Sequence, residues 1–378
     1  MNQVELYNAL VESLTNQGFH LNGHLSPKNL KKESFKKIQG YSKKEQLVLQ
    51  KDLIESNYDL VSEYLIDGSD INPENIELEL RLVEDNTIES KLYRWWNLVW
   101  WTVPYQKAYG RQMRFLLWDK THNAPFGLIG LQSPILRMAV RDEHLNIPKE
   151  DLDYIINKSM QAQRLGALPP YNKILGGKMV ALSVTSNEVR KAYNKKYKGV
   201  TTLMEERVIE PQLLFITTTS AFGKSSIYNR LKYDGIDVAE SLGYTKGAGS
   251  FHITEELYAE MLKFLKRRKI NVDKSFGNGP SRKVKLISQA FALLGLREYQ
   301  YHNIEREFFL FPIARNLENV IENGVRPVYH QRKLSDLTDF WKERWAIPRS
   351  IRNPDWNNFD ARQFMISTKR NVTRWSNQ

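Results

Sequence analysis

The spacing of apolar residues alternates along this chain between the period of a helix and the period of a strand. Leucines at helical spacing in residues 1–70 predict a mostly helical N-terminal region. Apolar and charged residues alternate at 76–82, which predicts a strand. Two apolar runs, at 115–118 and 126–131, flank a short turn and predict a β-hairpin.

The middle of the chain alternates predicted helices with predicted strands. The run KMVALSVT at 178–185 is mostly apolar, and buried strands have this composition. The elements expected here are a helix at 149–165, the strand at 178–185, a helix at 187–197, a strand at 213–216, a helix at 225–233 and an extended segment at 241–253. This order predicts an α/β (α+β) fold, with a mixed sheet and flanking helices.

The last third of the chain is more basic. Two helices, at 255–269 and 283–294, flank a glycine- and proline-containing loop at 276–282, and a strand follows at 306–313. We expect four regions: a helical region at 1–70, an α/β core at 71–254, a basic helical insertion with a closing strand at 255–330, and a basic C-terminal tail containing Arg and Trp at 331–378.

The composition of the chain limits the classes of function that it can have. The 378 residues carry a formal net charge of +12, which favours a polyanionic partner such as nucleic acid, with DNA considered first. The chain has no cysteine, which excludes disulfides and cysteine-ligated metal sites. No apolar run approaches the roughly 20 residues that span a bilayer, and the N-terminus lacks a signal-peptide pattern. We therefore expect a cytoplasmic protein without a membrane partner.

The most informative segment is LLFITTTSAFGKSSIYNRLKY at 213–233. Its Gly223-Lys224-Ser225 matches the second half of the phosphate-binding loop G-x-x-x-x-G-K-[ST], but Thr218 stands where the first glycine is required. A nucleotide-hydrolysing loop is therefore not favoured. The alternatives are an anion-binding helix N-terminus and simple helix capping by the serines. The anion-binding candidates in this segment are Lys224, Ser225, Ser226 and Arg230.

Basic and aromatic residues elsewhere are further candidates for nucleic-acid contact. Lysine and arginine bind phosphates without reading sequence. The candidates are Lys266, Arg267, Arg268 and Lys269, then Arg282, Lys283 and Lys285, with Tyr244, Lys246 and His252 in a glycine-rich neighbourhood. The alternative is a basic face that contacts only solvent.

Catalytic and metal-binding signals are weak. Tyr228, Glu305 and Glu307 are candidates for acid–base chemistry, and the alternative for the two glutamates is pairing with nearby arginines. His20 and His24 have the i, i+4 spacing of helical metal ligands, but glycines interrupt that helix. We expect no metal site and no cofactor.

Tryptophans cluster in Arg94-Trp-Trp-Asn-Leu-Val-Trp-Trp101. Core packing is the favoured interpretation, and a base-stacking platform is the alternative. A third possibility is that 95–101 and 341–345 are a docking surface for a partner protein.

The order of the central elements resembles the GNAT acetyltransferase superfamily. That resemblance implies a strand that feeds a helix whose N-terminus holds coenzyme A, and it places Tyr228 where a general acid is found. The glycine-containing turn of that superfamily is absent after the predicted strand at 178–185. Acyl transfer or phosphate-ester chemistry at 217–228 is therefore an alternative function, and whether the chain is an enzyme stays open.

Several long strings resemble the DruA family, the small component of the Druantia anti-phage system. They are WWNLVWWTVPY at 95–105, YGRQMRFLLWD at 109–119, PFGLIGLQSP at 125–134, GALPPYNKILGGKMVAL at 166–182, FITTTSAFGKSSIYNRLKY at 215–233 and SLGYTKGAGSFHI at 241–253. The resemblance implies a bacterial anti-phage role beside the helicase-like DruE or other Druantia components. Our leading hypothesis is a nucleic-acid-binding component of such a system, and self-association stays open.

Overall fold

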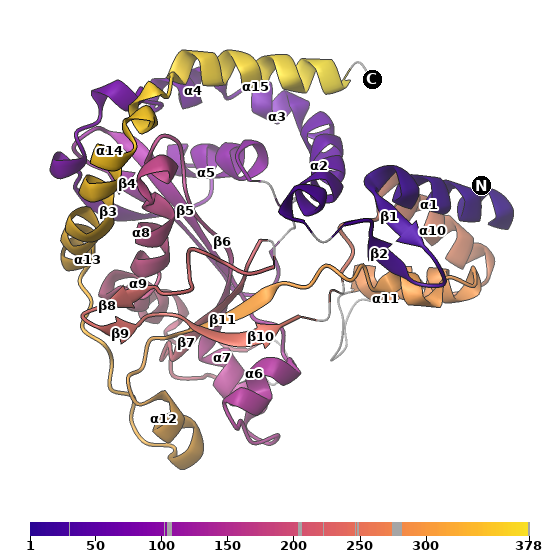
Figure 1. Cartoon of the computed structure of the whole chain (residues 1–378). Coiled ribbons are helices and arrows are strands. Elements are labelled where there is room, and N and C mark those ends of the chain that lie inside the picture. The colour runs from indigo at the N-terminus through magenta and orange to yellow at the C-terminus, as the bar shows by residue number, and fades with distance from the viewer. Residues whose placement is uncertain are drawn as a thin grey trace.

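The computed structural model describes residues 1–29, 31–101, 103, 108–202, 206–221, 223–245, 247, 249–273 and 282–376. A seven-stranded sheet with flanking helices makes up the larger part of the molecule, and a smaller helical module lies beside it (Figure 1). The predicted mixed α/β fold is confirmed.

The central sheet has the strand order β10-β11-β7-β6-β5-β4-β3. The strands are β3 (Leu78–Leu82), β4 (Gln112–Asp119), β5 (Ala124–Gln132), β6 (Ser159–Ala167), β7 (Phe215–Thr219), β10 (Glu240–Tyr244) and β11 (Glu307–Pro312). The β6–β7 pair is parallel and the other neighbours are antiparallel. The predicted strand at 76–82 and the predicted hairpin are confirmed as β3, β4 and β5.

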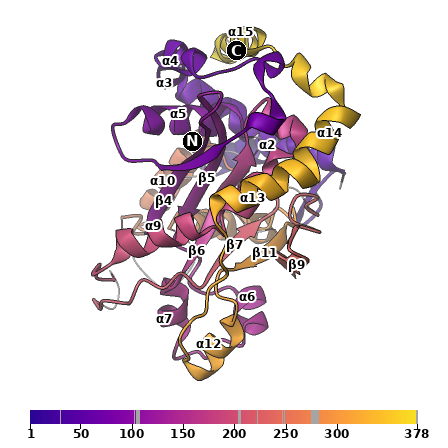
Figure 2. The same ribbon diagram turned by 90° about the vertical axis from the view of Figure 1, so that its left-hand side faces the viewer.

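Helices cover both faces of this sheet. On one face α8 (Gly176–Ser183) and α13 (Leu334–Trp341) share a hydrophobic cluster with alternate residues of β4 and β5. Figure 2 shows α13 on the same side of the molecule as α9 (Asn187–Tyr197). On the other face α5 (Ile88–Val99) packs against the sheet through Trp95 and Trp96, which are almost fully buried. The core-packing interpretation of these two tryptophans is confirmed.

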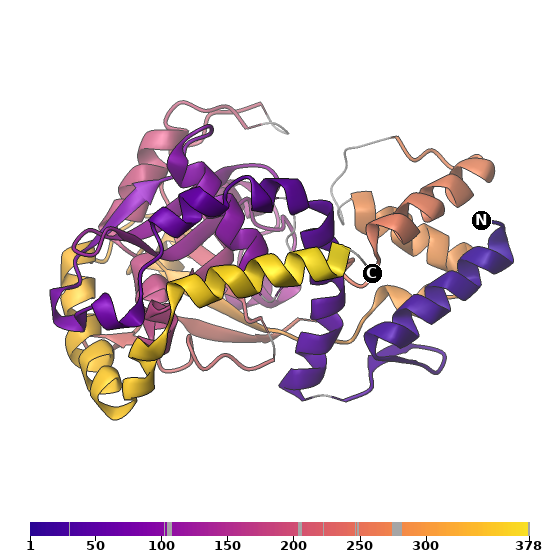
Figure 3. The same cartoon turned by 90° about the horizontal axis from the view of Figure 1, so that it is seen from above.

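The helical module joins segments that are far apart in sequence. The leucines of α1 (Gln3–Gln17) pack against α10 (Glu255–Arg267) and α11 (Arg282–Leu293) in one hydrophobic cluster. The hairpin of β1 (Phe19–Leu21) and β2 (Leu25–Pro27) adds to it. The long α2 (Lys32–Leu49) lies between this module and the sheet-containing part (Figure 3).

The basic C-terminal region is a run of helices folded along the larger part of the molecule. The elements after α13 are the π-helix Lys342–Ala346, α14 (Ile347–Arg352), the 3-10 helix Pro354–Asn358 and α15 (Ala361–Ser376). Trp341, Trp356 and Val372 are buried, so this region contributes to the core.

The remaining elements are short connections. They are α3 (Lys51–Glu55), α4 (Tyr58–Glu63), α6 (Ala139–His144), α7 (Leu152–Asn157), α12 (Leu317–Asn323), β8 (Lys232–Tyr233), β9 (Ile236–Asp237) and the 3-10 helices Gly68–Asp70, Pro73–Asn75, Tyr171–Ile174 and Arg297–Gln300. Within the described residues, no helix has the length and apolar composition needed to cross a membrane.

Three predicted elements are wrong. The predicted strand at 178–185 is the helix α8, whose apolar run reflects burial on all sides. The predicted helix at 149–165 consists of the short α7 followed by β6. The predicted helix at 225–233 is a series of turns that ends in β8. The predicted loop at 276–282 lies outside the described residues except for Arg282.

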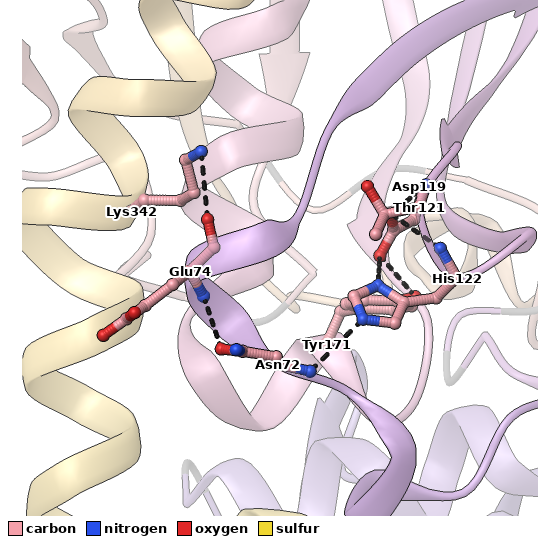
Figure 4. A network of polar contacts seen from close by, with 7 residues as sticks. All are labelled: Asn72, Glu74, Asp119, Thr121, His122, Tyr171 and Lys342. Atoms are coloured by element: carbon pink, nitrogen blue, oxygen red, sulfur yellow. Dashed lines mark hydrogen bonds and ion pairs between the residues drawn. The ribbon is translucent and has the colours of Figure 1, made fainter.

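A buried polar network fixes the β4–β5 turn (Figure 4). The Asp119 carboxylate accepts hydrogen bonds from the Tyr171 hydroxyl at 2.9 Å and from Nδ1 of His122 at 2.7 Å. The backbone N–H of Asn72 donates to Nε2 of the same imidazole at 3.2 Å. Burial and the adjacent Asp119 raise the pKa of Tyr171 well above its usual range. Since both nitrogens of His122 are engaged, this network holds structure together and offers no free base.

Candidate functional site

The candidate turn after β7 encloses a carboxylate that the chain itself supplies. Glu307, at the start of β11, is only 4% exposed. Its carboxylate accepts hydrogen bonds from the backbone N–H of Ser225 at 2.9 Å, from Nδ2 of Asn229 at 3.0 Å and from the Ser241 hydroxyl at 2.9 Å. The Ser225 amide that the sequence suggested for an external anion is therefore already bound to an internal one.

Backbone contacts attach the same turn to β11. The N–H of Ser220 donates to the carbonyl of Glu307 at 2.8 Å, and the N–H of Glu307 donates to the Ser220 hydroxyl at 3.0 Å. Gly223 adopts a φ of +43°, in the left-handed region that favours glycine, and its carbonyl also accepts from the Glu307 N–H at 3.2 Å. The turn and the strand therefore form one hydrogen-bonded unit.

The side chains of the turn have two different placements: one caps backbone N–H groups, and the others are exposed to solvent. The Ser225 hydroxyl accepts from the backbone N–H groups of Ile227 at 3.2 Å and Tyr228 at 3.3 Å, which is a capping role. Lys224, Ser226 and Arg230 are exposed, so their side chains can reach a ligand only from the outer surface.

The acid–base candidates are not brought together. Tyr228 is 7% exposed, and its ring packs edge-on against Phe309 at 5.0 Å and Phe311 at 5.6 Å between ring centroids. Burial raises the pKa of Tyr228 well above its usual range, despite a hydrogen bond with Thr218. Glu305 lies before β11 and is exposed, whereas Glu307 is buried. Tyr228 is therefore a packing residue, and the carboxylate of Glu307 has a structural role.

The basic candidates of α10 and α11 lie on the helical module; we call them the basic surface. Some of them bind neighbouring groups: Arg267 donates to the Met1 carbonyl, Arg268 to Oε1 of Gln3 at 2.5 Å, and Lys283 to Glu255 at 2.6 Å, while Arg282 lies 3.6 Å from Asp273. Lys266, Lys269 and Lys285 are exposed and form no ion pair with any residue that the structure describes. These three lysines are the part of the basic surface that is free to bind phosphate.

The aromatic and basic candidates around residue 250 do not form a common surface. Tyr244 is exposed at the end of the edge strand β10. His252 is fully buried, and its Nε2 lies 3.2 Å from the Tyr299 carbonyl. Burial lowers the pKa of His252 to about 4, so the imidazole is neutral near pH 7. Lys246 lies outside the described residues.

The groups that surround Glu307 carry no local sequence signal. Ser241 and Ser220 lie 66 and 87 residues from Glu307 in the chain, and only the pairing of β10, β11 and β7 brings them together. In the part of the chain that the structure describes, no three His, Asp or Glu side chains group in a way that could hold a metal ion.

Comparison with known proteins relates this chain to a protein family. The profile of the family described as Druantia protein DruA matches residues 29–323. The curated Druantia protein DruA of Escherichia coli (strain UMEA 4076-1) is 34% identical over 308 residues, which cover 79% of this chain and 75% of that protein. No solved structure matches the chain.

Proposed function

The chain belongs to the family of the Druantia protein DruA, and from this premise we propose that it acts in bacterial anti-phage defence as a nucleic-acid-binding component. The observation that carries the binding is the group of exposed lysines on the basic surface, Lys266, Lys269 and Lys285, which form no ion pair within the described residues, in a chain of net charge +12. The proposed site of action is the cytoplasm, where phage nucleic acid is present during infection.

Binding of this kind is electrostatic and does not read sequence. Lysine ammonium groups release counterions from the phosphate backbone, so affinity falls steeply as salt rises. Exposed Lys224 and Arg230 add positive charge on the turn after β7, and the proposal extends to them as a second contact region.

Fluorescence anisotropy with single-stranded DNA, double-stranded DNA and RNA, each across a salt series, tests the proposal. We expect binding that weakens as salt rises and that differs little between sequences of one strand type. Absence of binding to all three probes at low salt would overturn it.

We further propose that the protein assembles with other Druantia components, among them the helicase-like DruE. Trp341 is fully buried against Phe126 at 5.2 Å between ring centroids, which makes it unsuitable as a docking residue, whereas Trp345 is half-buried. Co-purification with tagged DruE, comparing wild type with Trp345→Ala, tests this proposal. Loss of the complex in the variant supports docking here, and full retention excludes Trp345 from it.

Acyl transfer is a second candidate, and the order of elements favours it. A hairpin, β6 feeding α8, and then β7 follow one another as the GNAT resemblance implies. However, a Cβ on Gly176 would lie 2.6 Å from the Tyr171 carbonyl, and the Trp341 indole donates to the Leu175 carbonyl at 3.1 Å. Tyr171 and Trp341 therefore pack closely against the start of α8, where the GNAT resemblance would place the coenzyme. A thermal shift with acetyl coenzyme A would support this candidate.

A further inference from the structure

The parallel strands of the sheet separate beside three cations, of which Arg164 is buried and Lys43 and Arg306 are partly buried. β6 and β7 pair only from Ser159 to Ala162 on the β6 side. Beyond that point β6 continues against β5, and β7 continues against β11. Arg164 lies on β6 just past this separation and is only 4% exposed.

Arg164 and Lys43 meet at the last turn of α5. Nε of Arg164 donates to Oδ1 of Asn97 at 2.5 Å, and Nζ of Lys43 donates to the carbonyl of Val99 at 2.8 Å. Both acceptors are neutral. Burial, together with the charge of Arg164, lowers the pKa of Lys43 to about 8.

Arg306 is the third cation of the group. It precedes Glu307, and its guanidinium carbon lies 5.9 Å from the centre of the Phe251 ring. Its Nε is buried and has no hydrogen-bond partner among the described residues. Burial and the charge of Arg164 lower the pKa of Arg306 to about 10. Arg164 is therefore close enough to repel both of the other cations.

α2 carries further polar groups to the same place. Gln39 is fully buried one helical turn before Lys43, and its Oε1 has no partner in the described structure. The Ser42 hydroxyl donates to the carbonyl of Phe251, the residue whose ring faces Arg306. Nε2 of Gln39 lies 3.5 Å from the carbonyl of Ala221, two residues before Gly223, which forms a β-bridge with Arg306.

Two of the three cations, Lys43 and Arg306, have no carboxylate partner among the described residues. Glu307 is adjacent to Arg306 in sequence, but successive side chains of a strand point to opposite faces, and its oxygens already accept from Ser225, Asn229 and Ser241. Cations that are largely shielded from solvent and have no opposite charge beside them are unfavourable, so Lys43 and Arg306 favour an anion from outside the chain.

We propose that Lys43, Arg164 and Arg306 form a binding site for a phosphate group carried by a nucleotide or by a nucleic-acid strand. Phosphate suits the site because its oxygens accept the parallel N–H groups of a guanidinium and because its charge neutralises more than one cation. The site lies at the sheet and is separate from the basic surface, so it stands whether or not that surface binds nucleic acid.

The test uses the full-length protein freed of nucleic acid. Thermal shift and titration calorimetry are run with pyrophosphate, ATP, coenzyme A and a short single-stranded DNA. The variants are Lys43→Met, which removes the charge, and Arg306→Lys, which keeps the charge but loses the guanidinium. Lys36→Met is the matched control, because Lys36 is exposed on the same helix. The variant with Lys266, Lys269 and Lys285 changed to glutamate separates this site from the basic surface.

We expect at least one probe to bind wild type and Lys36→Met equally, and about tenfold more weakly to Lys43→Met and Arg306→Lys. The probe that binds identifies the source of the phosphate. Without ligand, Lys43→Met should melt at the same or a higher temperature, because it removes a partly buried charge that has no ion pair among the described residues. The proposal is overturned if no probe binds at low salt, or if both variants bind as wild type does. It is also overturned if ligand-free Lys43→Met melts at a lower temperature and binding is unchanged in Arg306→Lys.

Discussion

The carboxylate of Glu307 accepts a hydrogen bond from the backbone N–H of Ser225 at 2.9 Å, across 82 residues of sequence. This contact indicates a structural role for the turn after β7. A turn that resembles an anion-binding loop here binds an anion of its own chain, and Asn229 and Ser241 complete the shell around it. The turn therefore connects β7, β10 and β11 through hydrogen bonds. Its exposed lysine remains available to a ligand.

Glu307→Ala should destabilise the protein by about 3 kcal/mol, because it removes the acceptor of the buried Ser225 N–H and of the side-chain donors of Asn229 and Ser241. Urea unfolding measures the loss. Glu305→Ala is the matched control, since Glu305 is exposed two residues away, and it should change stability by less than about 0.5 kcal/mol. Equal losses in the two variants would show that Glu307 does not hold the turn.

Lys224→Ala and Ser225→Ala should separate binding from structure within the turn. Lys224 is exposed, so its removal should leave stability unchanged and weaken nucleic-acid binding. The Ser225 hydroxyl caps two backbone N–H groups, so Ser225→Ala should cost about 1 kcal/mol of stability. Anisotropy and urea unfolding on both variants check this. Unchanged binding in Lys224→Ala would leave the turn with a structural role alone.

Acid should destabilise the protein through its buried histidine. The pKa of His252 is about 4 in the folded protein and near 6.5 when unfolded, so the unfolded state takes up the proton first as pH falls. Stability is therefore lost as pH falls below about 6.5, by about 2 kcal/mol at pH ~5. His330, whose pKa burial and Arg332 also lower to about 4, adds to this loss.

Urea unfolding at pH ~7.5 and pH ~5 tests the contribution of His252. His252→Gln should lose about 2 kcal/mol less between the two values than wild type does, whatever its stability at neutral pH. His20→Gln, in an exposed position, is the control and should follow wild type. A variant His252→Gln with the full acid sensitivity of wild type would contradict the assignment.

The sequence predicts those helices and strands whose pattern of apolar and polar residues is encoded locally. The hairpin β4–β5, the helices α9, α10 and α11 and the strand β11 carry clear periodicity, and the sequence predicts each of them. The run at 178–185 does not distinguish a buried helix from a buried strand, because all its positions from Met179 onward are buried. The sequence does not predict β6, because its glutamines and Arg164 suit a helix surface, although Arg164 is buried in the structure.

In the candidate site, too, the sequence predicts local contacts and does not predict contacts between distant segments. The capping role of Ser225 is encoded within three residues, and the sequence offers it as an alternative. The contacts of Glu307 depend on strand pairing between distant segments, and no local pattern predicts them. The approach of Lys43, Arg164 and Arg306 likewise requires α2, β6 and β11 to be in place.

Charge reversal on the basic surface should reduce the salt dependence of nucleic-acid binding. If Lys266, Lys269 and Lys285 each neutralise one phosphate, their joint replacement by glutamate lowers the slope of log affinity against log salt by about 2 to 3. Lys191, Lys195 and Lys198 are exposed in and just after α9, and their replacement changes net charge equally at a distant surface. Anisotropy across salt should therefore show a reduced slope for the first triple variant and a nearly unchanged slope for the second. Equal slopes for the two would mean that net charge, and not the basic surface, determines binding.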